Sequence, residues 1–136
     1  MTPTLPEILR GNFMCLAQPQ TADMAGDFMA SRIGVIALLN LLAAQEVEHG
    51  LAAVMAENAA ITTLLENATT YDVSPPNAPG MITPRVLDAH NAALRRALSA
   101  LHEVVEARGD DAEDRRILAL YIEMAAGRRL ELPPLA

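Results

Sequence analysis

The sequence predicts an all-α protein: an up-and-down bundle of four long helices plus a short N-terminal helix, with no strands. Hydrophobic residues make up 51% of the 136 residues, which is enough for a packed core. Aromatic residues make up 3% and tryptophan is absent, whereas strands are usually rich in aromatic and β-branched residues. The length suits one domain of ordinary size, so we expect a single helical-bundle domain over residues 1–136.

The first helix is expected at residues 5–17. Thr4 occupies the N-cap position, and Glu7 completes the spacing of a capping box. The helix has one short apolar stripe, made of Leu5, Ile8, Leu9, Phe13 and Leu16. A Gln-Pro-Gln-Thr sequence at residues 18–21 then ends it.

The longest helix is expected at residues 22–49, with Gly50 as its C-terminal cap. On a helical wheel, one side gathers Ala25, Phe28, Val35, Ile36, Leu39 and Ala43. The other side carries Leu38, Leu41 and Leu42. Because its middle is apolar nearly all round, we expect this helix to lie at the centre of the bundle.

The third helix, expected at residues 51–68, has two different faces. One is a stripe of large apolar residues: Leu51, Val54, Met55, Ile61 and Leu65. The other is an arc of small uncharged residues: Ala52, Ala56, Ala59, Ala60 and Thr63. Small side chains let two helices approach closely, so we expect this arc to pair with its own copy in a symmetric homodimer.

A proline-rich loop is expected inside the domain at residues 69–83. It is longer than most connections in a compact domain, which indicates a segment that is either functional or loose. Thr83 and Pro84 then begin the fourth helix, as its N-cap and first helical residue.

The last helix is expected at residues 111–126. Gly109 ends the helix before it, and Asp110 and Glu113 have the spacing of a second capping box. Gly127 is placed to cap the C-terminal end.

Charge and cysteine content exclude several classes of protein. The net charge of −7 argues against a nucleic-acid-binding surface, which needs clustered cations. Cys15 is the only cysteine, so an intrachain disulfide is excluded. The first residues lack the features of a signal peptide, and the longest apolar stretch, at residues 33–44, falls short of the roughly 18 residues that span a bilayer. We therefore expect a cytoplasmic protein that binds neither nucleic acid nor membranes.

No catalytic set is evident, and we expect no catalytic residue and no cofactor. A glycine-rich phosphate loop and a serine-nucleophile motif are both absent from the sequence. Glu46 and His49 form one Glu-x-x-His motif, but a carboxylate-bridged metal bundle needs two. The segment from His102 to Glu106 has part of the zinc-protease pattern without its second histidine. We therefore expect no metal site.

Three polar residues fall on apolar helix faces: Arg32, Asn58 and His90. Arg32 lies in the strongest apolar stripe, so we expect it to be buried and paired, with Asp114 as one candidate partner. One interpretation is an internal polar network that fixes how the helices pack. The other is a pocket in which Arg32 holds the carboxylate or phosphate of a small anionic or acyl ligand, with Asn58 and His90 as further contacts.

Residues 44–50 (AQEVEHG) and 91–94 (NAAL) resemble stretches of a small, uncharacterised bacterial all-helical family. Members of that family occur beside, or fused to, aminoglycoside-phosphotransferase-like proteins and acyl-CoA dehydrogenases. The resemblance implies an accessory subunit and not an enzyme. Together with the absence of a catalytic set, it predicts a non-catalytic interaction or accessory bundle that self-associates and can bind a protein partner. The alternative is a small-ligand-binding bundle that uses Arg32, Asn58 and His90.

Overall fold

A computed structural model describes residues 5–17 and 27–133, with side chains described for 5–17 and 31–133. The α-helices are α1 (Leu5–Leu16), α2 (Asp27–Gln45), α3 (Leu51–Asn67), α4 (Pro84–Arg108) and α5 (Asp111–Gly127). A π-helical turn, η1 (Glu46–Gly50), follows α2, and a short 3-10 turn, η2 (Thr69–Tyr71), follows α3. These two ranges contain no strand, so the predicted all-α class is confirmed.

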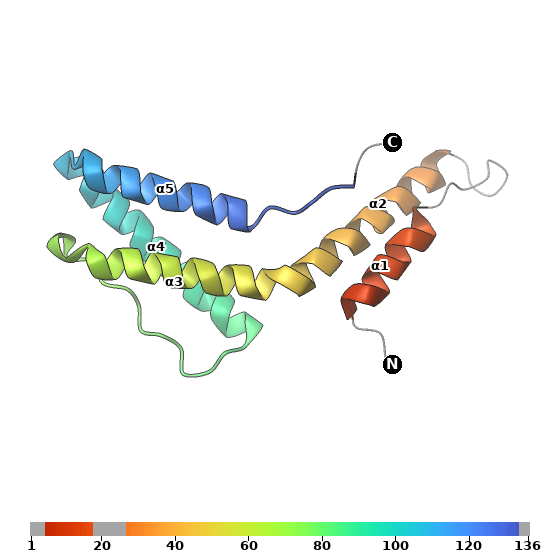
Figure 1. Ribbon diagram of the computed structural model, residues 1–136, viewed down its shortest axis with the longest axis horizontal. Coiled ribbons are helices and arrows are strands. Elements are labelled where there is room, and N and C mark those ends of the chain that lie inside the picture. Colours follow the sequence, from red (N-terminus) through yellow and green to blue (C-terminus); the bar gives the residue numbers. More distant parts are fainter. Residues whose placement is uncertain (1–4, 18–26, 134–136) are drawn as a thin grey trace. The chain divides into compact units, whose positions relative to one another are not determined.

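The chain forms two compact units (Figure 1). Unit 1 comprises Met1–Gly50 together with Leu130–Ala136, and unit 2 comprises Leu51–Arg129. Each unit is described by itself, and the single domain expected from the sequence remains a prediction. Within the described ranges, no helix is both long enough and apolar enough to cross a membrane.

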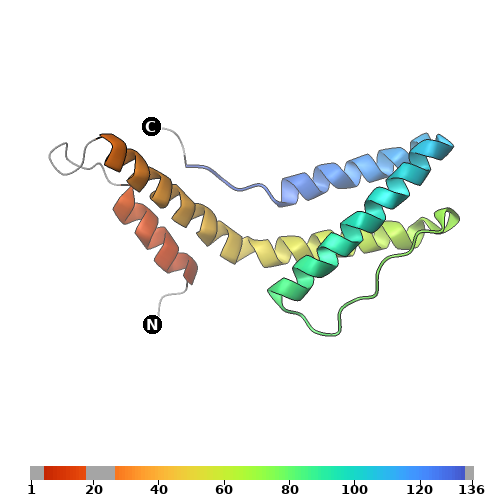
Figure 2. The ribbon, with the colours of Figure 1, turned by 180° about the vertical axis from the view of Figure 1, so that it is seen from behind.

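Unit 1 is built on an antiparallel helical hairpin of α1 and α2, which lie side by side in Figures 1 and 2. Two contacts fix their direction. Arg10 of α1 forms an ion pair with Glu48, and Asn12 Nδ2 donates to Asn40 Oδ1 at 3.4 Å. Because the residue numbers rise along one helix as they fall along the other, the helices run in opposite directions.

The segment after α5 joins unit 1 through Gln45, the last residue of α2. Gln45 Nε2 donates to the Glu131 carbonyl at 2.7 Å, and the Glu131 N–H donates to Gln45 Oε1 at 2.8 Å. This pair of bonds satisfies both ends of one side-chain amide with one backbone residue. The α-helix ends at Gln45, but the chain stays helical through η1 to Gly50, and α3 begins at the next residue. The predicted C-terminal cap at Gly50 is therefore wrong.

Unit 2 contains the hydrophobic core. Its buried cluster draws on α3, α4 and α5, and is made of Ile61, Leu65, Ala68, Tyr71, Leu94, Leu98, Leu101, Val105, Ile117, Leu120 and Met124. The α4 members recur every three or four residues, which places them on one face of the helix. These residues therefore form the buried face of α4.

Helix directions in unit 2 follow from the length of the connections. The short link at Gly109 makes α4 and α5 antiparallel, as expected for an up-and-down pair. By contrast, α3 and α4 run in the same direction, because Asn91 contacts Glu57 while Arg108 contacts Thr70. The proline-rich segment, drawn in green in Figure 2, runs back along α3 to the start of α4. An extended chain covers about 3.3 Å per residue against 1.5 Å in a helix, so residues 72–83 can span the length of α3.

Local signals set the helix ends of unit 2. Thr83 Oγ1 accepts from the Val86 N–H at 3.2 Å, with Pro84 as the first residue of α4. Asp110 Oδ1 accepts from the backbone N–H groups of Ala112 and Glu113, both at 3.1 Å. The predicted N-caps of the fourth and fifth helices are thereby confirmed. The predicted C-terminal cap at Gly127 is wrong, because Gly127 is the last residue of α5 and Arg128 is the C-cap. The predicted cap at Thr4 and the predicted helical residues 22–26 lie outside the described residues.

Candidate functional site

The three polar residues singled out in the sequence are placed in different surroundings. Arg32 lies on α2 in unit 1, whereas Asn58 on α3 and His90 on α4 belong to unit 2. Asn58 is buried at 7% exposure and His90 is half-buried. Arg32 is exposed, so the expectation that it is buried is wrong.

The reason for the exposure of Arg32 is the choice of packing face on α2. The buried residues of this helix are Ala37 and Ala44, which lie together on one side of the wheel. Small side chains allow close approach of the partner helix, so α1 packs on this side. The opposite side carries Arg32 with three large apolar residues, which we call the α2 stripe: Val35, Ile36 and Leu39. The stripe expected to face the core therefore faces outward.

The buried polar residues of unit 2 form a cluster around Glu57, whose side chain is only 3% exposed. Glu57 Oε1 accepts from Asn91 Nδ2 at 2.8 Å and from Arg95 Nε at 2.6 Å. Glu57 Oε2 accepts from Arg128 Nε at 2.7 Å. Asn91 Nδ2 also donates to Asn58 Oδ1 at 2.8 Å, and Arg128 Nη2 donates to Asn91 Oδ1 at 3.2 Å. This Glu57 cluster connects α3, α4 and the residue that follows α5.

The electrostatics of the Glu57 cluster favour an ionised carboxylate. Burial by itself would raise the pKa of Glu57, but the hydrogen bonds from Arg95, Asn91 and Arg128 outweigh it and lower that pKa from 4.5 to about 2. The same bond to Glu57 raises the pKa of Arg95. The cluster is therefore a bonded, charge-compensated structure within the unit.

Asn58 takes part in this cluster as an acceptor, and its Nδ2 is buried without a hydrogen-bond partner. Sequence reasoning found Asn58 but missed Glu57, Asn91, Arg95 and Arg128. Glu57 precedes Asn58 directly and Asn91 follows His90 directly, and both are buried beside the apolar residues of their helices. The sequence pattern gave no reason to select Arg128, because it lies beyond the predicted last helix.

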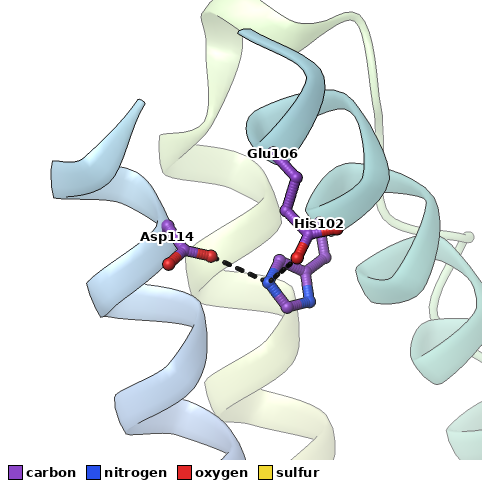
Figure 3. A group of neighbouring side chains, drawn as sticks. All are labelled: His102, Glu106 and Asp114. Carbon is purple, nitrogen blue, oxygen red and sulfur yellow. Dashed lines mark hydrogen bonds and ion pairs between the residues drawn. The ribbon is translucent and has the colours of Figure 1, made fainter. Parts of the chain in front are cut away.

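A second polar group lies between α4 and α5 (Figure 3). His102 Nε2 lies 2.9 Å from Asp114 Oδ1 and 3.8 Å from Glu106 Oε1. The ring of His102 packs against that of Tyr121, with the ring centres 5.6 Å apart. Side-chain exposure is 20% for His102, 32% for Asp114 and 65% for Glu106. One imidazole and two carboxylates therefore converge at the surface of unit 2.

Asp114 is the residue of this group that sequence spacing failed to assign. It was a candidate partner for Arg32, but its carboxylate contacts His102. The turn at Gly109 reverses the chain, so residues at similar distances before and after it become neighbours. A single sequence shows the spacing of His102 and Glu106 on one helix but not which side chain of the next helix faces them.

Comparisons with protein families, with curated proteins and with solved structures found no match to this chain. Function is therefore inferred from three features of the structure: the α2 stripe, the Glu57 cluster and the group around His102.

Proposed function

We propose that the protein is a non-catalytic accessory module, located in the cytoplasm, that self-associates through the α2 stripe. The observation that carries the proposal is the exposure of this stripe. Val35 is 58% exposed, Ile36 is 49% exposed and Leu39 is 58% exposed. They lie within about one quadrant of the helix at 100° per residue, so they form one continuous apolar face.

The hairpin that carries the stripe has little core of its own. Of the described side chains in unit 1, the buried ones are Ala37 and Ala44, and both are small. Helices in proteins owe most of their stability to packing of an apolar face. Burial of large aliphatic side chains contributes about 25 cal/mol per Å² of apolar surface. A partner helix on the α2 stripe would supply the burial that the hairpin lacks.

The shape of the stripe favours a second copy of this chain as the partner. Ser31, Arg32, Val35 and Ile36 line a shallow depression on α2. Leu39 lies on the same face, one turn further along. Four residues of one helix surrounding a side chain of the facing helix is the usual unit of helix packing. A face that carries both the depression and the inserted side chain is self-complementary, as a two-fold interface requires.

The surface first expected to form the dimer is partly used inside unit 2. Ala56 and Ala60 of the alanine arc line a cavity of about 150 Å³, together with Leu120 and Met124 of α5. This wall of the arc therefore already faces another helix of its own unit. The α2 stripe has larger side chains and is the better candidate for self-association.

The ligand-binding alternative has less support. It needs Arg32, Asn58 and His90 to line one pocket. Asn58 instead belongs to the bonded Glu57 cluster, and Arg32 is exposed on α2. A mutually bonded buried group is the arrangement expected of an interaction module whose polar residues fix helix packing.

The test is sedimentation velocity of the full chain at tens of micromolar, compared with Leu39→Glu. We expect the wild type to sediment as a dimer and Leu39→Glu as a folded monomer, because a carboxylate in an apolar interface loses its hydration. Ile122→Glu is the matched control. Ile122 lies on α5 in unit 2 at 71% exposure, so the same chemical change there leaves the dimer intact.

Two results would contradict the proposal. A wild-type protein that is monomeric at this concentration would rule out self-association. A dimer that both glutamate variants disrupt equally would show non-specific apolar association and not an interface at the α2 stripe. Far-UV circular dichroism of each variant establishes that it is folded.

A further inference from the structure

We propose that His102, Glu106 and Asp114 form a binding site for a divalent first-row transition metal, with Zn²⁺ as the ion to test. The sequence led us to expect no metal site, because only two of these residues share a recognisable spacing. The third comes from α5 and is brought into place by the fold (Figure 3).

The distances are close to those that a shared metal imposes on its ligands. Nitrogen and carboxylate ligands lie about 2.1 Å from Zn²⁺, so two ligands of one ion are about 3.0–3.4 Å apart. His102 Nε2 is 2.9 Å from Asp114 Oδ1 and 3.8 Å from Glu106 Oε1. All three ligand atoms lie within 4.8 Å of one another. Glu106 is exposed, so its side chain has room to turn toward the other two ligands.

The donor set is one that zinc uses. An imidazole nitrogen with carboxylate oxygens suits Zn²⁺ and its neighbours, whereas Mg²⁺ prefers oxygen ligands alone. Three protein ligands leave the remaining position for water. In the described part of the chain, the ion pairs of Glu106 and Asp114 are made with His102. The arginines nearby in the sequence bond elsewhere, Arg116 to Glu113 and Arg115 to the Asp111 carbonyl.

The imidazole is held in a fixed orientation before any ion arrives. The ring of His102 packs against Tyr121 at an interplanar angle of 52°. This contact directs Nε2 toward both carboxylates, and an oriented ring binds metal more tightly than a mobile one. A metal bound at Nε2 requires the ring proton to lie on Nδ1.

The site joins two helices, so metal binding has a structural consequence. His102 and Glu106 are one turn apart on α4, and Asp114 lies in the first turn of α5. An ion that binds all three connects α4 to α5. Because the unfolded chain does not preserve this arrangement, metal binding stabilises the folded unit 2.

The experiment is calorimetric titration of the full-length protein with Zn²⁺, repeated with His102→Ala and with Asp114→Asn. We expect one Zn²⁺ per chain in the wild type and an affinity reduced by about tenfold or more in each variant. Asp114→Asn keeps the side-chain shape, so it tests the charge and ligand without the loss of packing that His102→Ala brings. The midpoint temperature of thermal unfolding, followed by tyrosine signals, should rise with Zn²⁺ in the wild type and not in the two variants.

His49→Ala is the matched control. His49 also lies beside a carboxylate, at 3.8 Å from Glu48, but no third ligand joins them among the residues that the structure describes. Its replacement should leave Zn²⁺ affinity unchanged. The proposal is overturned if the wild type binds no Zn²⁺, if binding survives both His102→Ala and Asp114→Asn, or if His49→Ala abolishes it. Equal binding of Mg²⁺ and Zn²⁺ would also overturn it, because it would indicate an acidic surface without selectivity.

Discussion

The two units have similarly apolar sequences but differ in how far they bury their large apolar side chains. Unit 2 buries large aliphatic side chains completely, with Leu94, Leu98, Leu101, Val105 and Ile117 all at 0% exposure. In unit 1 the buried side chains among the described residues are those of two alanines, and the three residues of the α2 stripe remain half-exposed. Hydrophobic content therefore does not decide burial. Three helices can enclose a core between them, whereas a two-helix hairpin covers only one face of each helix.

The largest expected difference is in the stability lost when a leucine is replaced by alanine in unit 2 or in unit 1. Leu98→Ala should lower the free energy of unfolding of unit 2 by about 2–5 kcal/mol, because it leaves a cavity in a closed core. Leu39→Ala should change the stability of the monomer by about 0.5 kcal/mol or less. Both tyrosines, Tyr71 and Tyr121, belong to unit 2 and the chain has no tryptophan, so tyrosine fluorescence in urea reports this unit. Far-UV circular dichroism reports the helices of both units, and equal effects of the two substitutions on the urea midpoint measured in this way would contradict the comparison.

The second prediction concerns pH and distinguishes the polar interior of unit 2 from the surface of unit 1. The pKa of Glu57 is about 2 in the folded protein, against 4.5 for a glutamate without these surroundings. A lowered folded-state pKa stabilises the fold above 4.5, and this contribution is lost as the pH falls toward 2. The loss amounts to about 3 kcal/mol. Urea unfolding followed by tyrosine fluorescence, at a pH just above 4.5 and again near 2, measures it.

Glu57→Gln serves as the control for this prediction. It removes the titrating group while keeping its shape, so the variant should be less stable near neutral pH and show a smaller decrease on acidification. If wild type and Glu57→Gln lose stability in parallel over this range, the bonds around Glu57 do not determine the acid sensitivity.

The smallest expected effects come from replacing two glycines that both have open space around them. They differ in backbone conformation, because one lies within a helix and the other has a positive φ. A Cβ at Gly34 or at Gly109 would meet no atom within 4 Å. Gly109 ends α4 at a φ of 68°, where a side chain is unfavourable, so Gly109→Ala should destabilise unit 2 by about 1 kcal/mol. Gly34 lies within α2, where alanine is the better helix former, so Gly34→Ala should raise helix stability by up to about 1 kcal/mol. Thermal unfolding followed by circular dichroism should show shifts of opposite sign.

Sequence reasoning succeeded where the determinant was local. The caps at Thr83 and Asp110 depend on side chains within three residues of the groups they bind, so the ends of α4 and α5 were predictable. The all-α class followed from composition in the same way. The parallel directions of α3 and α4 were not predictable, since the length of the loop is compatible with either direction.

The candidate sites were harder to predict because they depend on which helix faces meet. Arg32 was assigned to the core on the strength of its stripe, but α1 packs against the side with Ala37 and Ala44. His102 and Glu106 were recognised on one helix, whereas Asp114 required knowledge of the turn at Gly109. In both cases the missing information was the rotation of one helix relative to its neighbour, which no single-helix pattern contains.

The bonds between Gln45 and Glu131 have a consequence for the order of folding during synthesis. Unit 2 is one uninterrupted stretch of chain, so it has all its residues once Arg129 has left the ribosome. Unit 1 is discontinuous, because its second segment, from Leu130 onward, follows unit 2 in the chain. Because domains fold as their sequences become available, unit 2 completes its core before the C-terminal segment reaches α2. The bonds between Gln45 and Glu131 therefore form after the core of unit 2 is complete.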